Sequence, residues 1–246
     1  MIIRCYGAKG SIPVSGKQYL KYGGDTTCLE IRSKNDEIII VDAGSGIRRL
    51  GNKLLDEQRY EYNIIFSHPH MDHILGFPFF KPIYNEKAII NLMGCPATQG
   101  DISKPLSRAM SAPFFPIQFD QLKAKINYTA DCPICFSIDS IEIFPINLSH
   151  PNVGIGYKFI EDGKTFVFLT PIYSLCKHGL VIVLETNFPL CTKIGNITFV
   201  VTSTVFLIIK YSNFGGKVNT FSQRDYSLQI IRTRFVISSP WNIIFK

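Results

Sequence analysis

The sequence is poor in histidine, with five residues in 246, and it has no internal repeat and no low-complexity tract. Its longest apolar stretch, Ile194 to Ile209, is interrupted by Gly, Asn, Ser and three Thr residues and falls short of a comfortable membrane span. The N-terminus reaches Arg4 without an apolar stretch of signal-peptide length. We therefore expect a cytoplasmic protein with no membrane partner.

Acidic residues are scarce in the C-terminal third of the chain. Residues 1–170 hold 18 Lys and Arg residues against 17 Asp and Glu residues, a balance of +1, whereas residues 171–246 hold 8 against 2, a balance of +6. The net charge of +7 thus belongs mainly to the tail. A basic surface that attracts a polyanion is not supported in the first 170 residues, so nucleic acid is a partner that the charge distribution does not favour.

Strand and turn patterns fill the first 170 residues. The run EIIIVDAG (37–44) predicts a strand covered on both faces, and the apolar spacing of IRRLGNKLLDEQ (47–58) predicts a helix. CLEIRS (28–33) alternates and predicts a half-buried strand. VGIGYKFIEDGKTFVFLT (153–170) predicts a hairpin. Six prolines between residues 77 and 120 predict an irregular excursion with short helical pieces.

Three of the five histidines, with an aspartate, lie in SHPHMDH (67–73), directly after the apolar run of a predicted strand. Imidazoles two residues apart on an extended segment project to the same side, so His68 and His70 can bind one ion. Asp72 and His73, where the chain turns, can face a second ion. A histidine-rich surface loop is the alternative, but this residue set at a strand end favours a metal site.

Another side chain at a strand end is Asp42, which closes the run EIIIVD. Sites in layered α/β proteins are built at the carboxyl ends of strands, so we expect Asp42 near the histidines. A pair of metal ions about 3.5–4 Å apart can activate a hydroxide and neutralise the charge that develops on a substrate oxygen. The pattern therefore predicts metal-dependent hydrolysis.

The run HPHMDH matches the HxHxDH motif of the metallo-β-lactamase superfamily, and its surroundings resemble one branch, the bacterial phosphodiesterase-like members. That branch holds phosphoribosyl cyclic phosphodiesterases and is related to tRNA 3′-end processing endonucleases. The likeness covers residues 2–170 and is carried by RCYGAKGSIPVSG, YGGDTTCLEI, IIIVDAGSGIRRLG, SHPHMDHILGFPFFKPIY, MSAPFFPIQF and LSHPNVGIGYKFIEDGKTFVFLT. It implies an α/β protein with an αββα sandwich and a two-metal hydrolytic site. Zinc is the usual metal, with manganese or iron as alternatives.

The resemblance also assigns roles to individual residues. It implies three histidine ligands for the first metal: His68, His70 and His150. Asp72 and His73 would bind the second metal, and Asp72 is the residue expected to serve catalysis as well. Asp42 matches an aspartate that supports the histidine loop by hydrogen bonds rather than binding metal.

The resemblance stops at residue 171. After FVFLT the family has an aspartate that bridges both metals, and later a histidine, but here position 171 is Pro and only His178 follows, in a different context. We therefore expect a metallo-β-lactamase-like domain at residues 1–170, with a fold that is incomplete or altered at its C-terminal end. Residues 171–246 are a divergent segment that could complete the same domain.

Without the bridging carboxylate, the second metal keeps Asp72 and His73 unless another side chain substitutes. The tail offers three candidates: His178, Glu185 and Asp225. The chain could thus hold one zinc instead of two. The abrupt loss of both the resemblance and the acidic residues suggests that the tail was recruited, replaced or read from a different frame.

Two functions from different classes follow. The first is a hydrolase that cleaves a small phosphodiester, such as a cyclic nucleotide or a cyclic ribose phosphate, through a metal-bound hydroxide. The second is a catalytically impaired or non-catalytic metal-binding remnant of the fold, supported by Pro171 and the missing late histidine. Dimerisation is common among relatives, which makes a homodimer compatible with either function.

Overall fold

The computed structural model describes residues 1–94, 101–129, 134–148 and 154–169 and, beyond them, only the backbone of 180–194, 197–209, 236–238 and 242–244. Its α-helices are α1 (Ile47–Asp56), α2 (Met71–Ile74) and α3 (Ser103–Ala109). Short 3-10 helices lie at Lys17–Tyr19, Phe77–Phe79, Lys81–Tyr84 and Phe119–Gln121. The strands are β1 (Ile2–Gly7), β2 (Cys28–Arg32), β3 (Ile38–Val41), β4 (Glu61–Phe66), β5 (Ile89–Gly94), β6 (Lys125–Thr129), β7 (Phe136–Ile138), β8 (Ile141–Leu148), β9 (Gly154–Glu161), β10 (Lys164–Leu169), β11 (Leu180–Ile194), β12 (Ile197–Ile209), β13 (Val236–Ser238) and β14 (Asn242–Ile244).

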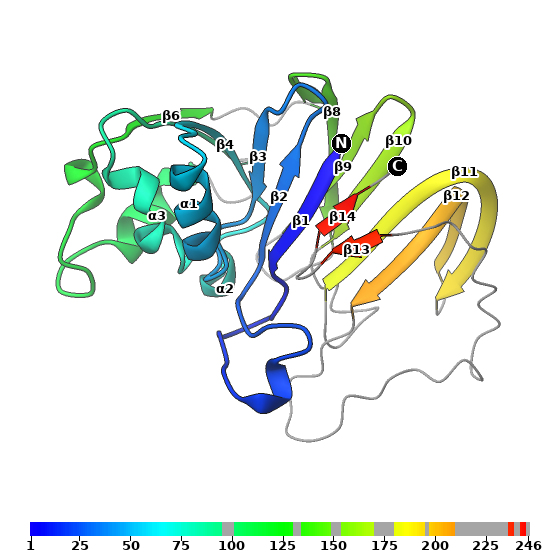
Figure 1. The fold of residues 1–246 in the computed structure, drawn as a ribbon, viewed down its shortest axis with the longest axis horizontal. Coiled ribbons are helices and arrows are strands. Elements are labelled where there is room, and N and C mark those ends of the chain that lie inside the picture. The colour runs from blue at the N-terminus through cyan, green and yellow to red at the C-terminus, as the bar shows by residue number, and fades with distance from the viewer. Residues whose placement is uncertain are drawn as a thin grey trace.

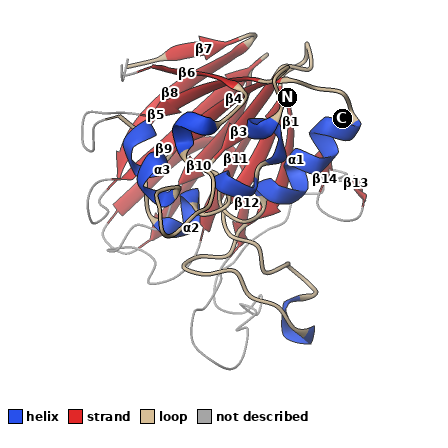
Figure 2. Cartoon of the chain, turned by 90° about the vertical axis from the view of Figure 1, so that its left-hand side faces the viewer, coloured by secondary structure: helices blue, strands red, loops and turns tan. Residues whose placement is uncertain are grey.

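Two sheets form the centre of the molecule. One has eight strands in the order β13-β14-β1-β2-β3-β4-β5-β6, and the other has six in the order β12-β11-β10-β9-β8-β7. The helices cover the face of the first sheet that points away from the second sheet (Figures 1 and 2). Within the described ranges this makes three layers, helix, sheet and sheet, and no described helix covers the outer face of the second sheet. The α/β class is confirmed, and the described part of the chain holds three layers of the αββα sandwich.

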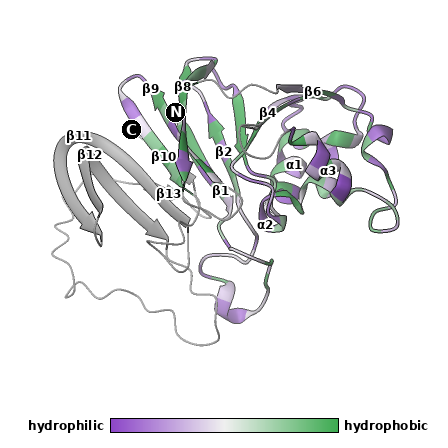
Figure 3. Ribbon diagram, turned by 180° about the vertical axis from the view of Figure 1, so that it is seen from behind, coloured by the Kyte–Doolittle hydropathy of each residue, from purple (hydrophilic) through white to green (hydrophobic). Residues whose placement is uncertain are grey.

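The predicted doubly covered strand at 37–44 is confirmed as β3. All four of its side chains are fully buried, and alternate ones point to opposite faces of the sheet. Ile38 and Ile40 pack in the core under the helices, whereas Ile39 and Val41 pack in the core between the sheets. Figure 3 shows apolar, green segments on the strands in the middle of the molecule.

The helix predicted at 47–58 is confirmed as α1. Its buried residues are Ile47, Leu50, Gly51 and Leu54, which recur at helical spacing and face the first sheet. Gly51 is required by close packing, because a Cβ there would lie 2.7 Å from Cδ2 of Phe80. Each leucine that is fully buried in this way stabilises the fold by about 1.5–3 kcal/mol.

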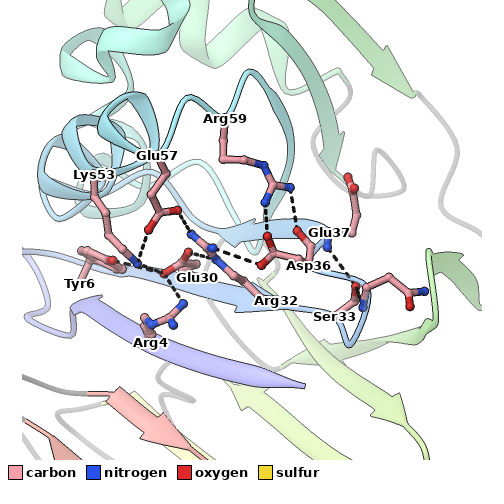
Figure 4. Close-up of polar contacts among 11 residues, drawn as sticks. Arg4, Tyr6, Glu30, Arg32, Ser33, Asp36, Glu37, Lys53, Glu57 and Arg59 are labelled. Atoms are coloured by element: carbon pink, nitrogen blue, oxygen red, sulfur yellow. Dashed lines mark hydrogen bonds and ion pairs between the residues drawn. The ribbon is translucent and has the colours of Figure 1, made fainter.

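The prediction that 28–33 is half-buried was wrong, because every residue of β2 is buried. Glu30 is fully buried, and its carboxylate accepts hydrogen bonds from Arg32 at 2.5 Å, Lys53 at 3.2 Å and Arg4 at 3.3 Å (Figure 4). Buried charges are tolerated when they are paired and hydrogen-bonded. An alternation of charged and apolar residues indicates an exposed face only when the charged side chains have no buried partners. In β2 the charged side chains are paired with residues of neighbouring elements, so the strand is buried.

The excursion at 77–120 contains short helices, as predicted, but also β5, which was not predicted. β5 pairs in parallel with β4, from Glu61 opposite Ile89 to Phe66 opposite Gly94. Its neighbours on both sides, β4 and β6, provide hydrogen bonds that a local sequence pattern does not reveal. The hairpin predicted at 153–170 is confirmed, with Asp162 and Gly163 both at positive φ in the turn between β9 and β10.

Strands from the chain beyond residue 170 join both sheets. β11 pairs antiparallel with β10, and β14 pairs antiparallel with β1 through Ile243 opposite Ile3. β11 also pairs antiparallel with β12, from Leu180 opposite Ile209 to Ile194 opposite Ile197. Among the described helices, none combines the length and the apolar character needed to cross a membrane.

Candidate metal site

The carboxyl ends of β3 and β4 bring the two predicted parts of the site together. The two strands are parallel neighbours with Val41 opposite Ile65, and the Asp42 backbone N–H donates to the Ile65 carbonyl at 2.9 Å. Asp42 follows β3 and the SHPHMDH loop follows β4, so both leave the sheet at the same edge. The expectation that Asp42 lies beside the histidine loop is confirmed.

Asp42 is fully buried and accepts three hydrogen bonds from that loop. Its Oδ1 accepts the Ser67 backbone N–H at 2.7 Å, and its Oδ2 accepts the Ser67 hydroxyl at 2.8 Å. The Nδ1 of His73 lies 2.7 Å from the same Oδ2. A carboxylate with these partners holds the loop in place, and its oxygens are already occupied by protein donors.

The hydrogen bonds indicate which nitrogen of each buried imidazole carries the proton. His73 donates from Nδ1 to Asp42, which leaves its Nε2 as an acceptor. Ser67 gives its single hydroxyl proton to Asp42, so its oxygen can accept from Nδ1 of His68 at 3.0 Å. In both histidines these contacts favour the tautomer with the proton on Nδ1 and with Nε2 as the acceptor nitrogen, which is a form that can bind metal.

The three histidines of the loop form one group. The ring centroid of His68 lies 4.5 Å from that of His70 and 4.1 Å from that of His73. His68 and His73 are buried, at 4% and 3% exposure, whereas His70 is half-buried. The group thus has an inner side fixed by the protein and an accessible side at His70.

Asp72 and His73 fit the ligation of one metal ion. Oδ2 of Asp72 lies 3.6 Å from Nε2 of His73. Two donors about 2.0–2.1 Å from a tetrahedral metal ion lie about 3.4 Å apart, so this separation suits a shared ion. Within the described ranges, no group of three or more His, Cys, Asp or Glu side chains is arranged to hold an ion, so Asp72 and His73 supply a pair of donors and not a complete set.

Close backbone packing around the short helix α2 keeps these side chains in register. The backbone N–H of Ala43 donates to the His73 carbonyl at 2.7 Å, and that of Gly76 donates to the Ala43 carbonyl at 2.9 Å. A Cβ on Gly76 would lie 2.0 Å from the backbone carbonyl oxygen of Gly44, and a Cβ on Gly44 would lie 2.5 Å from the backbone carbonyl oxygen of Asp72. The two glycines therefore permit the loop after β3 to touch the loop after β4.

The electrostatic surroundings of the histidines differ. Burial alone lowers the pKa of His73, but the Asp42 carboxylate and its hydrogen bond outweigh burial and raise that pKa above the ordinary value. Burial lowers the pKa of His70, against the opposing attraction of Asp72. A proton therefore competes with a metal ion more strongly at His73 than at His70.

Several residues named from the sequence lie outside the described residues. They are His150, Pro171, His178 and Asp225, and the side chain of Glu185 in β11 is likewise outside them. The structure does describe the strand that follows His150. In β9, the backbone N–H of Ile155 donates to the Ser67 carbonyl at 3.0 Å, and the hydroxyl of Tyr157 donates to the Phe66 carbonyl at 2.7 Å.

Two residues of the site were missed by reasoning from the sequence. Ser67 belongs to the motif, but no role was predicted for it. A hydroxyl next to a candidate ligand histidine can support that histidine by a hydrogen bond, and this residue type was the available signal. Ser11 is the second: its backbone N–H donates to Oδ2 of Asp72 at 2.8 Å, across 61 residues of sequence. A hydrogen bond donated by the backbone of a distant segment cannot be predicted from the residue types.

The sequence profile described as the metallo-beta-lactamase superfamily matches residues 22–185. This range contains Asp42, the SHPHMDH loop and position 150. Members of this superfamily generally bind metal ions, usually zinc. No curated protein matches the chain in sequence.

Several solved structures are similar to part of the chain. The metallo-beta-lactamase fold protein YhfI from Bacillus subtilis is 17% identical, with a TM-score of 0.48, over 67% of this chain and 59% of that chain. A diphosphatase from the PhnP family is 16% identical, with a TM-score of 0.45, over 64% and 62%. The short form of human tRNase Z is 17% identical, with a TM-score of 0.46, over 74% and 71%. The chain thus matches less than two thirds of the length of the first two proteins.

Proposed function

Because the chain belongs to the metallo-beta-lactamase superfamily, whose fold is that of metal-dependent hydrolases, we propose that it hydrolyses a small phosphodiester. The proposed substrate class is a cyclic nucleotide or a cyclic ribose phosphate. The single observation that carries the proposal is the chain of contacts from buried Asp42 through His73 to Asp72, which ends in two donors 3.6 Å apart. The near-neutral charge of residues 1–170 supports a small substrate over a nucleic acid.

The proposed ligands are His68, His70 and His150 for one metal and Asp72 and His73 for the other. When bound, zinc or manganese would supply a Lewis acid that polarises a phosphoryl oxygen and lowers the pKa of a water molecule. Asp42 and Ser67 keep the imidazoles in the ligating tautomer, and burial of the inner histidines limits their access to bulk water. The hydrogen bond from Ile155 to Ser67 supports the role of His150, because it anchors the next strand within five residues of that histidine.

We also propose that residues 171–246 complete the same domain. The support is that β11 extends the second sheet beside β10 and that β14 extends the first sheet beside β1. The segment thus extends one edge of each sheet. Candidate substitutes for the missing bridging ligand, such as His178 and Glu185, would then belong to the domain that carries the histidine loop.

A second function rests on position 171. Proline has no side-chain donor, so a second metal ion would lack the carboxylate that bridges both ions in the family. A chain that binds one metal ion or none, and turns over no substrate, would be a remnant of the fold kept for another role.

The two functions are separated by metal content and turnover on the same preparation. Metal per chain is measured after purification without chelator, and hydrolysis of bis(4-nitrophenyl) phosphate is followed before and after addition of zinc or manganese. We expect bound metal and turnover that vanish in His68→Ala. Absence of turnover at every metal concentration would favour the remnant.

A matched pair of carboxylate variants tests Asp72. Asp72→Ala removes a proposed ligand, whereas Glu86→Ala removes an exposed carboxylate whose ion pair with Lys123 spans 3.2 Å. We expect Asp72→Ala to lose zinc and to reduce turnover by at least about 100-fold, since a metal ligand and its Lewis acid are lost together. Glu86→Ala should match the wild type in both measurements, and equal behaviour of the two variants would contradict the role of Asp72.

A further inference from the structure

The loop after β1 reaches the candidate metal site from a distant part of the sequence. It is tied to the segment before β2 at two points: Lys9 donates its backbone N–H to the Asp25 carbonyl at 3.0 Å, and Val14 donates to the Gly24 carbonyl at 2.9 Å. A Cβ on Gly24 would lie 1.7 Å from the Val14 oxygen, so this contact is a close backbone approach. Residues 10–13 are therefore held at both ends beside the site.

Ser11 forms the tip of this loop in an unusual conformation. Its φ is 74°, in the left-handed region that serine adopts rarely, and the Ile12 backbone N–H donates to the Gly10 carbonyl at 3.1 Å across it. A hydrogen bond from residue i+2 to residue i defines a three-residue γ-turn, and the form with positive φ is rare and strained. Strain of this kind persists where the surrounding structure holds it.

The donor of the turn's hydrogen bond is the Ile12 N–H, whereas the Ser11 N–H points at Asp72. The N–H donates to Oδ2 at 2.8 Å, and the same oxygen lies 3.6 Å from Nε2 of His73. A carboxylate oxygen has two lone pairs. One can accept the Ser11 N–H while the other faces the position between Asp72 and His73.

We propose that the backbone amide of Ser11 is a positioning group that orients the Asp72 carboxylate as a metal ligand. This inference rests on the proposed function, because it assumes that Asp72 binds metal. Asp72 is 18% exposed at its side chain and would otherwise rotate, whereas a donor on a loop tied to residues 24 and 25 limits that rotation. The contact matters more in this chain than in one with a bridging aspartate, since Pro171 leaves the second metal with fewer ligands.

The test compares two substitutions at the same position. Ser11→Gly keeps the N–H and readily adopts positive φ, whereas Ser11→Pro removes the N–H and requires a φ near −65°. Zinc affinity is measured by competition with a chromophoric chelator, and the Asp72-dependent zinc is defined as the zinc that Asp72→Ala loses. Thermal unfolding of each metal-free variant reports whether it folds.

We expect Ser11→Gly to bind zinc as the wild type does. Ser11→Pro should lose about 10–100-fold in affinity for the Asp72-dependent zinc, the usual effect of removing a group that supports a ligand. Equal affinities in Ser11→Pro and the wild type would overturn the inference while leaving the proposed function intact. No zinc in the wild type, or no zinc lost in Asp72→Ala, would overturn both.

A second measurement does not depend on the folding of the proline variant. In the wild type, the amide proton of Ser11 should exchange slowly with solvent, because it is held by Asp72. Exchange by nuclear magnetic resonance should become faster in Asp72→Ala and stay slow in Glu86→Ala. Fast exchange in the wild type, or no change in Asp72→Ala, would overturn the inference as well.

Discussion

Among single residues, Asp42 has the most consequences for the candidate site. It is fully buried, and its two oxygens accept from the Ser67 backbone, the Ser67 hydroxyl and His73. Because three donors point at this one carboxylate, both its negative charge and its two acceptor oxygens are needed to hold the histidine loop. A neutral amide of the same size would keep the volume but present two hydrogens where donors now point.

Asp42→Asn should therefore weaken metal binding without removing a proposed ligand. We expect zinc affinity to fall by about 10–100-fold, because the imidazole of His73 loses the partner that fixes its tautomer. The matched control is Asp162→Asn, since Asp162 is 59% exposed at its side chain and pairs with Lys34 at 2.8 Å. Competition with a chelator measures both variants, and equal affinities would contradict a supporting role for Asp42.

At the scale of elements, β2 is attached to α1 and β1 by charge as well as by apolar packing. Burial alone would raise the pKa of Glu30, but Arg32, Lys53 and Arg4 outweigh burial and hold that pKa below its ordinary value. Arg32 also pairs with Glu57 at the end of α1 and with Asp36 after β2 (Figure 4). The pairs link three elements that carry no metal ligand.

The depressed pKa of Glu30 predicts how stability depends on pH. Its contribution is fully present above the unfolded pKa of about 4.3 and is lost as the pH falls through the lower folded value. The free energy of unfolding of the wild type should thus fall more steeply below pH 5 than that of Glu30→Gln. Urea unfolding at pH 7 and pH 4 measures this, and parallel losses in the two proteins would contradict it.

Removal of the Glu30 carboxylate should be costly at neutral pH. Glu30→Ala leaves Arg32 and its neighbours without their buried partner, which typically costs about 3–5 kcal/mol. A matched control is Glu86→Ala, whose carboxylate is exposed and pairs only with Lys123 among the described ion pairs. Urea unfolding should show a small change for the control, and comparable losses in both variants would argue against the network.

The contact between the loops after β3 and β4 predicts a second effect at this scale. Gly76→Ala places a Cβ 2.0 Å from the Gly44 oxygen, whereas Gly10→Ala meets no atom within 4 Å. We expect Gly76→Ala to lose about 1–3 kcal/mol of stability, because neighbouring backbone must shift. Gly10→Ala should remain close to the wild type in urea unfolding, and a similar loss in both would exclude close packing as the cause.

For the whole molecule, the question is how the chain beyond residue 170 relates to the rest. Its strands join both sheets, yet acidic residues become scarce after residue 170 and the superfamily profile stops a short way into this part of the chain. The superfamily profile ends at residue 185, within β11. We retain the hypothesis that this part of the chain was recruited, replaced or read from a different frame, and the last of these makes a direct prediction.

That hypothesis predicts a result at the level of the gene. Translation of the other two frames beyond codon 170 should restore an aspartate directly after the FVFLT strand and a histidine further on. If it does, the corrected chain should bind two metals per molecule in the chelator assay, because the bridging ligand returns. Absence of both residues from the two alternative frames would reject the hypothesis.

Local patterns in the chain were enough for several features of the fold and the site. Unbroken β-branched residues predicted β3, the apolar spacing predicted α1, and the residue types in SHPHMDH identified the candidate ligands. The predictions of β3 and α1 were confirmed because burial on one or both faces of an element depends on residue type and spacing. Ligation of metal by the histidines of SHPHMDH stays a prediction from residue type.

Contacts between distant segments required the folded chain. The burial of β2 depends on partners contributed by β1 and α1, and β5 depends on hydrogen bonds from β4 and β6. The tautomers of His68 and His73 follow from one buried carboxylate at the end of another strand, and the donor to Asp72 is a backbone amide 61 residues away. A backbone N–H is the same in every residue except proline, so only the path of the chain decides where it points.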